Sequence, residues 1–146
     1  MEKIIIKSIN KPTQKDTDYL IIWFCKAFGL VGEKGGSDIE VQIMKKFLTA
    51  SFDNKGLSSS EIKIGKEPIA RSTIIYNLNR FIESGLVVKK GRKYYFRAKE
   101  LSSAIEEIEY DIEREMQRML DIAKEFDKLF EMNRRKIRRI KTAKGI

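Results

Sequence analysis

The sequence predicts a mainly α-helical protein with a small β-hairpin and a long C-terminal helix of the coiled-coil type. Apolar residues recur at helical spacing in two stretches, 39–48 and 74–82. Two β-prone segments then flank a turn that contains Gly91. From residue 98 to 140 the chain contains neither proline nor glycine, and apolar residues recur every three or four positions. Four heptads of that kind indicate a long helix that pairs with another helix.

Residues 1–37 are expected to form an N-terminal extension with a buried helix. A short edge strand is expected at residues 3–9. Asp16 supplies N-cap chemistry at the start of the helix. The following run, residues 19–30, is apolar on nearly all sides, which predicts burial.

Residues 38–98 are expected to hold three helices and the hairpin. The first of these helices is amphipathic, and a short one is expected to start at the serines of 58–62. A third helix is expected at 69–84, and Gly85 is placed to end it in a left-handed conformation. The hairpin is expected at 86–96.

The composition restricts the possible functions. With 146 residues, the chain is long enough for one compact domain plus an appendage. Lys and Arg number 30 against 21 Asp and Glu, a formal net charge of +9, so nucleic acid is the first partner to consider and an anionic membrane surface the second. The absence of histidine excludes Ser-His-Asp and Cys-His catalysis and histidine metal sites.

The same composition predicts a soluble, cytoplasmic protein. The start of the chain lacks a signal-peptide core, and no apolar run approaches a membrane span. The single cysteine, Cys25, allows no internal disulfide and fits a reducing compartment. Few glutamines, no histidine and 35% charged residues resemble a thermophile composition.

Charge is segregated along the chain. Residues 1–54 carry a net charge of +1 and residues 55–98 carry +7. Residues 99–132 carry −6, and the tail, residues 133–146, carries +7. Two basic blocks separated by an acidic one indicate a division of labour, because a surface evolved for stability alone mixes its signs.

Three segments resemble the core of MarR-, ArsR- and PadR-type winged-helix transcription regulators. They are SSSEI at 58–62, ARSTIIYNL at 70–78 and FIESGLV at 81–87, and the resemblance covers about residues 38–98. It implies a winged helix-turn-helix domain that binds double-stranded DNA, with a recognition helix in the major groove and a basic wing on the phosphates.

The spacing agrees with this resemblance. With Ile74, Leu78 and Phe81 facing inward, polar residues of the same helix are expected to face outward and to contact DNA. These recognition-helix candidates are Arg71, Ser72, Thr73, Tyr76, Asn77 and Arg80. The wing candidates are Lys89, Lys90, Arg92 and Lys93. The alternative for the wing is a solvated turn, and the alternative for the whole domain is a protein-interaction module in a larger assembly.

Residues 99–132 are expected to form a long acidic dimerisation helix that gives a homodimer. Its predicted contact residues are Leu101, Ile105, Ile108, Ile112, Met119, Ile122, Phe126 and Leu129. The alternative is that this helix folds back onto its own domain. The basic tail has three alternatives: contact with DNA phosphates, contact with RNA, or a solvated end.

No enzyme is predicted, because the chain lacks both a Walker-type and a Rossmann-type glycine pattern. We therefore expect no catalytic residues, no metal and no cofactor. The sequence points to no small-molecule effector, and it does not define the DNA target.

Overall fold

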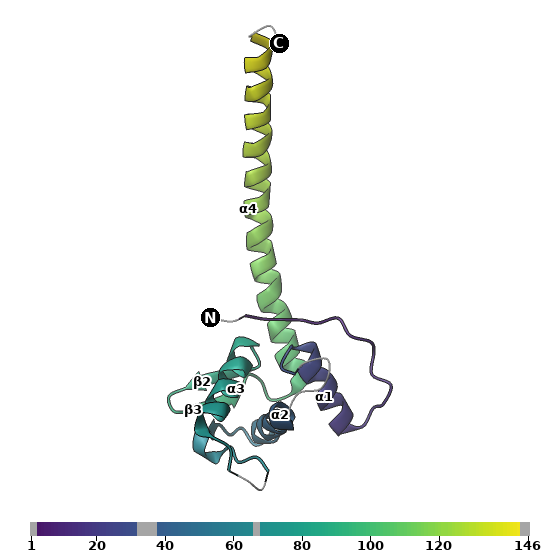
Figure 1. The fold of residues 1–146 in the computed structure, drawn as a ribbon, viewed down its shortest axis with the longest axis vertical. Helices are drawn as coiled ribbons and strands as arrows, with labels where there is room; N and C mark the ends of the chain where they lie inside the picture. The colour runs from purple at the N-terminus through teal and green to yellow at the C-terminus, as the bar shows by residue number, and fades with distance from the viewer. Residues whose placement is uncertain (1–2, 32–37, 66–67, 144–146) are drawn as a thin grey trace. The chain divides into compact units, whose positions relative to one another are not determined.

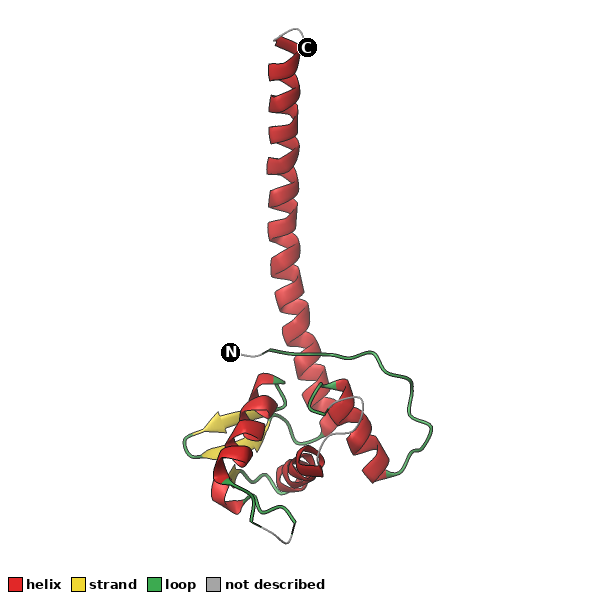
Figure 2. Ribbon diagram, in the orientation of Figure 1, coloured by secondary structure: helices red, strands yellow, loops and turns green. Residues whose placement is uncertain are grey.

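The structure, a computed structural model, describes residues 3–31, 38–65 and 68–143. The chain divides into two units, Met1–Ile108 and Glu109–Ile146. Figure 1 shows the order of the elements, and Figure 2 shows that most of them are helices. The predicted mainly α fold with a small antiparallel sheet and a long last helix is confirmed.

Helix α1 spans Thr17–Ala27 and begins where the sequence predicted. The side chain of Asp16 accepts a hydrogen bond from the backbone N–H of Tyr19 at 2.9 Å, which satisfies one of the free donors of the first turn. Ile21 and Cys25 are buried, but Ile22 on the other side is 36% exposed. The helix is therefore buried along one face only, and the prediction of burial on all sides is wrong.

The expected edge strand at residues 3–9 is absent from this described segment, which is extended but pairs with no strand. Its backbone N–H groups instead bind free carbonyls at helix ends. Lys3 donates to the Glu83 carbonyl at 2.8 Å, and Lys7 donates to the Ala27 carbonyl at 2.7 Å. The last carbonyls of a helix lack partners within the helix, so these bonds satisfy them without a sheet.

Helix α2 spans Asp38–Phe52 and supplies the centre of the core. Ile43, Met44 and Phe47 are almost completely buried. The helix packs against α1 on one side and the sheet on the other. The sequence predicts a cap at Ser37 or Asp38; Ser37 lies outside the described residues, and Asp38 is the first residue of the helix.

The predicted short helix at 58–62 is wrong. Strand β1, Leu57–Ser58, pairs with the hairpin, and only a single 3₁₀ turn, η1, Ser59–Glu61, follows. Ile62 and Ile64 are both buried, a spacing of two that a helix could not bury on one face.

Helix α3 spans Arg71–Glu83, slightly shorter than expected. Its inward face carries Ile74, Leu78 and Phe81, all buried as predicted. Gly85 ends the helix with a φ of 86°, the left-handed conformation that its position in the sequence indicated. Figure 1 shows α3 lying beside the hairpin, against which it packs.

The predicted hairpin is confirmed. Strands β2, Val87–Lys90, and β3, Lys93–Phe96, pair antiparallel, and β1 adds to the other edge of β3 to give the order β1-β3-β2. Along β3, Tyr94 is buried in the core, whereas Tyr95 points to the opposite face.

Helix α4 spans Leu101–Ala143. Its first two turns belong to the first unit, where Ile108 is only 2% exposed and Ala104 is fully buried. Leu101 and Ile105 are half-buried in the same unit. The assignment of Ile108 to a dimer contact is therefore wrong, because the chain's own domain covers it, and Leu101 and Ile105 are already partly covered.

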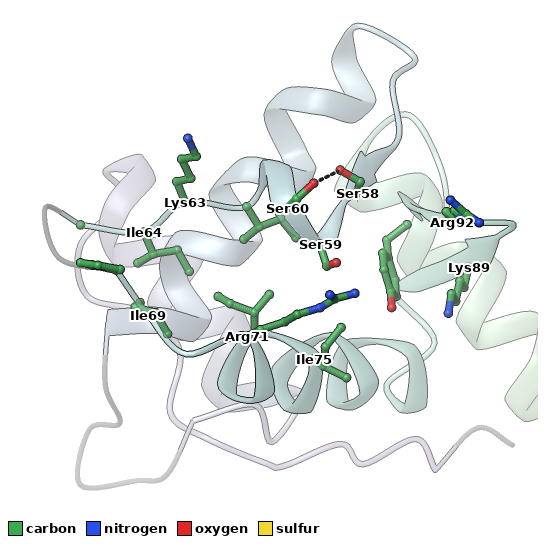
Figure 3. A pocket seen from close by; sticks show the side chains of 15 residues that line it. Ser58, Ser59, Ser60, Lys63, Ile64, Ile69, Arg71, Ile75, Lys89 and Arg92 are labelled. Atoms are coloured by element: carbon green, nitrogen blue, oxygen red, sulfur yellow. Dashed lines mark hydrogen bonds between the residues drawn. The ribbon is translucent and has the colours of Figure 1, made fainter.

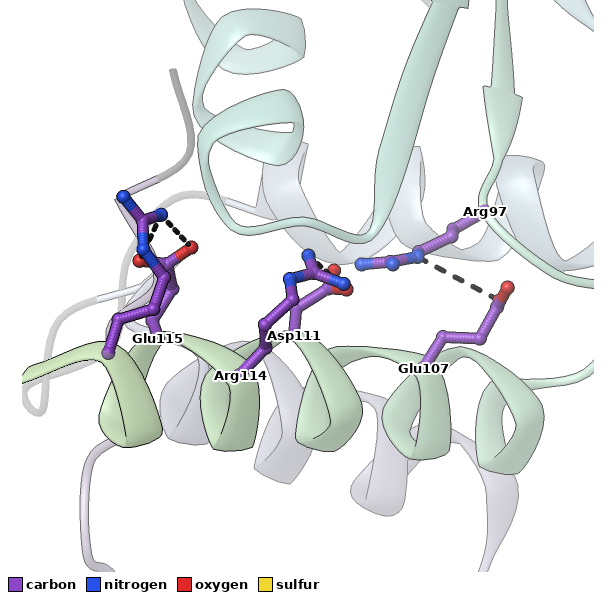
Figure 4. A network of polar contacts seen from close by, with 6 residues as sticks. Arg97, Glu107, Asp111, Arg114 and Glu115 are labelled. Atoms are coloured by element: carbon purple, nitrogen blue, oxygen red, sulfur yellow. Dashed lines mark hydrogen bonds and ion pairs between the residues drawn. The ribbon is translucent and has the colours of Figure 1, made fainter. Parts of the chain in front are cut away.

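Charged side chains near the start of α4 form ion pairs, shown in Figure 4. Arg97 lies 3.8 Å from Glu107 within the first unit, and Arg114 lies 3.2 Å from Asp111 within the second. The Arg114–Asp111 pair lies within one helix, and pairs of this kind stabilise a helix by roughly a few tenths of a kcal/mol. In the described part of the chain, no helix has the length and apolar character needed to cross a bilayer.

Gly56 provides a test of the packing between β1 and the hairpin. A Cβ at this position would lie 2.5 Å from Cζ of Tyr95, so the ring leaves no room for a side chain. We expect Gly56→Ala to lower the free energy of unfolding by about 1–3 kcal/mol, measured by urea denaturation. In a Tyr95→Ala background the same change should cost much less, because the obstructing ring is gone. Equal costs in both backgrounds would contradict this contact.

Candidate nucleic-acid interface

The N-terminal part of α3 presents several polar side chains to solvent. Ala70, the N-cap, provides no side-chain hydrogen bond to the first turn, so the positive end of the helix is not capped by a side chain. Arg71 and Ser72 are exposed, Thr73 is half-buried, and Tyr76 is 63% exposed. These four predicted residues share one accessible surface that carries a guanidinium group, hydroxyls and an aromatic ring.

Asn77 does not belong to this surface, and the prediction that it faces outward is wrong. Its side chain is 4% exposed, and Nδ2 donates a hydrogen bond of 3.0 Å to the Thr73 carbonyl one turn earlier. Oδ1 is buried without a hydrogen-bond partner among the described residues. Position 77 lies between the inward positions 74 and 81 on the helix, so the same rotation that buries those residues also buries the amide.

Arg80 is also not an outward-facing contact. Nη2 donates a hydrogen bond of 2.8 Å to the carbonyl of Gly29, and Nη1 lies 3.8 Å from Oε1 of Glu40. The guanidinium lies 5.9 Å from the ring centre of Tyr76. Arg80 therefore connects α3 to the end of α1 and to α2, which makes it a structural residue.

The wing presents its four predicted cations at the end of the hairpin. Lys89, Lys90, Arg92 and Lys93 are all exposed. Lys90 and Lys93 stand directly opposite one another across the two strands. Like charges in such a position destabilise a hairpin, and among the described residues neither lysine forms an ion pair that would compensate.

An open groove of about 920 Å³ lies between the start of α3, the segment that follows β1, and the wing. Figure 3 shows Arg71 reaching from α3 across this groove, with Lys89 and Arg92 on the wing side. Lys63 adds a fourth cation, and side chains such as Ile64 line the apolar part. The groove thus brings Arg71 of the predicted recognition helix together with two of the four predicted wing cations, whereas Lys90 and Lys93 do not line it.

Sequence reasoning missed the contribution of the segment between β1 and α3. Ser59, Ser60 and Lys63 line the groove. The sequence pattern placed Ser59 and Ser60 in a short helix at 58–62 and gave Lys63 no role. The alternation Ile62-Lys63-Ile64 was the available signal, because a period of two turns Lys63 away from two buried neighbours.

Cys25, the single cysteine of the chain, is not prepared for reaction. Cys25 is fully buried, and the pKa of its thiol is raised from 9.0 to about 12, mainly by burial and secondarily by the nearby Glu40 carboxylate. A thiol with this pKa remains protonated near neutral pH and is unreactive. Within the described ranges, no group of three or more acidic or cysteine side chains is arranged to hold a metal ion.

The chain was also compared with known proteins. No protein-family model matches it, no curated protein matches its sequence, and no solved structure matches its fold.

The structural role of Arg80 and the surface position of Arg71 can be distinguished by the effect of each residue on the free energy of unfolding. We expect Arg80→Ala to lower the free energy of unfolding by about 1–3 kcal/mol, because the Gly29 carbonyl loses its half-buried donor and the Glu40 carboxylate loses a nearby cation. Arg71→Ala should change it by less than about 0.5 kcal/mol, because Arg71 is exposed. Urea denaturation of both variants tests this, and similar losses in both would contradict the assignment.

Proposed function

We propose that this protein is a sequence-specific double-stranded DNA-binding protein of the winged helix-turn-helix class, acting as a dimeric transcription regulator. In this proposal α3 is the recognition helix and enters the major groove. The hairpin β2–β3 is the wing and contacts the phosphate backbone. Neither role requires a cofactor.

The order of the elements supports the class. A helix, a short strand, a single helical turn, a second helix and an antiparallel hairpin follow one another from α2 to β3. This is the order of a winged helix-turn-helix domain, with η1 in place of a full second helix. The segments that resemble known regulators, 58–62, 70–78 and 81–87, coincide with η1, α3 and the start of the wing.

The observation that carries the proposal is the positive charge gathered around the groove and at the hairpin tip. Arg71, Lys89 and Arg92 line the same groove, and Lys90 faces Lys93 across the hairpin tip. This arrangement costs folding free energy unless an anion lies nearby. The phosphates of DNA supply that anion in a regular array, and their neutralisation releases counterions.

The uncapped start of α3 suits the same ligand. Backbone N–H groups at a helix N-terminus and the helix dipole favour a phosphate. Arg71 stands at this end, where the first residues of a recognition helix reach base edges, and its planar guanidinium fits the two acceptors of guanine. Tyr76, exposed one turn further along, is placed for contact with the backbone or with a thymine methyl group.

Dimerisation is supported by the second unit. Beyond Glu109, α4 exposes Met119, Ile122, Phe126 and Leu129, which are four of the predicted contact residues. A helix with this apolar stripe is only marginally stable alone in water and gains from a partner. Two copies would bring two recognition helices to a pseudo-palindromic site.

The wing can be tested through the salt dependence of binding. We expect the protein to bind random duplex DNA with an affinity that falls steeply with salt concentration. Lys90→Ala with Arg92→Ala should weaken binding and reduce the slope of log K against log salt by about two phosphate contacts, roughly 1.8. Fluorescence anisotropy across a salt series measures this.

A matched control removes the same charge elsewhere. Lys124→Ala with Lys128→Ala neutralises two exposed lysines of the second unit and should leave the slope nearly unchanged. Equal losses of DNA affinity in both double variants would show that only the net charge matters, and would contradict the wing assignment. No binding at low salt would favour the protein-interaction alternative.

Arg71 tests sequence recognition, once a preferred site has been selected from random DNA. Arg71→Ala should reduce the affinity for that site by about 1–3 kcal/mol, the value of a bidentate base contact. Its effect on random DNA should be smaller, comparable to the loss of one phosphate contact. Competition binding with both DNAs measures the ratio, and an unchanged ratio would contradict the role of α3 in base recognition.

A further inference from the structure

The second unit carries an apolar face that is exposed between residues 116 and 129. Met116, Met119, Ile122, Phe126 and Leu129 are each more than half exposed. An exposed apolar stripe of this length marks an interaction site. A helix in water has little stability unless its apolar face packs against a partner.

The stripe follows a heptad repeat that three polar residues, Glu115, Asn133 and Lys136, interrupt. With Ile112 as an a position, the later a positions are 119, 126, 133 and 140, and the d positions are 115, 122, 129 and 136. The polar interruptions nearest the centre are Glu115 and Asn133. Each lies nine residues from Lys124, on opposite sides of it.

This symmetry matters for the direction in which two copies pair. In an antiparallel pair centred on residue 124, Glu115 of one copy faces Asn133 of the other. Between these two polar layers the contacts are Met119 with Leu129 and Ile122 with Phe126, each formed twice, so every central layer is apolar. A parallel pair would instead place Glu115 against Glu115.

The distribution of charged residues along the helix is also centred on residue 124. Residues 109–115 hold four carboxylates and one arginine, and residues 133–139 hold five cations and no carboxylate. Both segments are equally far from residue 124, so antiparallel pairing places opposite charges side by side at both ends. Parallel pairing would place five cations beside five cations, and Lys136 against Lys136 in a d layer, which is unfavourable.

We propose that the second unit pairs with a second copy of this chain as an antiparallel coiled coil, with Lys124 at its centre and the basic segment 133–139 against residues 109–115 of the other copy. This inference rests on the dimer that is part of the proposed function. As a consequence, the two DNA-binding first units would leave the coiled coil at opposite ends. The two Glu109 residues would lie roughly 45 Å apart, at 1.5 Å per residue.

Single cysteines distinguish the two directions. The native Cys25 is buried with a raised pKa and does not interfere, so the full chain can carry one added cysteine. In the antiparallel pair, Met119→Cys lies beside position 129 of the other copy but about 15 Å along the helix from its own counterpart, too far for a disulfide. In a parallel pair, the two cysteines at position 119 are adjacent.

The experiment oxidises Met119→Cys, Leu129→Cys and a refolded mixture of the two, and it measures the shift from the 17.0 kDa chain to a disulfide-linked dimer on a non-reducing gel. We expect the dimer band only in the mixture. Gln117→Cys, mixed with either variant, is the matched control on the outer side of the helix and should not cross-link. Sedimentation of the reduced wild type reports whether a dimer exists.

Cross-linking of Met119→Cys with itself would establish parallel pairing and overturn the inference, without affecting the proposed DNA binding. A sedimenting dimer with no cross-link in the mixture would mean that another face or register pairs, and would also overturn it. A monomer in sedimentation would remove both the inference and the dimer in the proposed function, while the salt series would still test the DNA-binding domain alone.

Discussion

The structure of the first unit depends on the burial of one face of α3. Leu78 and Phe81 are fully buried, and the ring of Phe81 lies 6.0 Å from that of Phe47 in α2. This contact fixes the rotation of α3 about its axis. That rotation decides which polar residues reach solvent, and Arg80 holds it through the carbonyl of Gly29. The candidate DNA-binding surface is therefore a consequence of core packing.

The two units divide the charge of the chain between them. The groove of the first unit collects cations from three segments, and the hairpin tip adds Lys90 opposite Lys93. In the second unit, carboxylates near Glu109 and cations after Asn133 lie at opposite ends of one helix. Within the second unit, pairs such as Arg114–Asp111 and Arg135–Glu131 offset part of this charge locally. In the proposed complexes, DNA phosphates would offset the charge of the first unit and a reversed second copy that of the second.

Much of the fold followed from local pattern. The cap at Asp16, the left-handed Gly85, the hairpin and the long last helix depend on residues close together in the sequence, so local energetics identify them. The 3–9 and 58–62 segments were predicted wrongly. Their conformation depends on distant partners, the carbonyls of Glu83 and Ala27 for the first and strand β3 for the second, and no local pattern reveals those.

The sequence by itself determined the classes of element, the exposed cations of the wing and the apolar stripe of the second unit, because charge and hydrophobic period are properties of the chain. Only the tertiary structure decided how each helix is rotated and what covers it. It buried Asn77 and Ile108 and turned Arg80 into a structural residue, and it made Lys63 and Arg71 line the same groove. The physical reason is that burial depends on which surfaces meet, and packing between segments far apart in the sequence sets that.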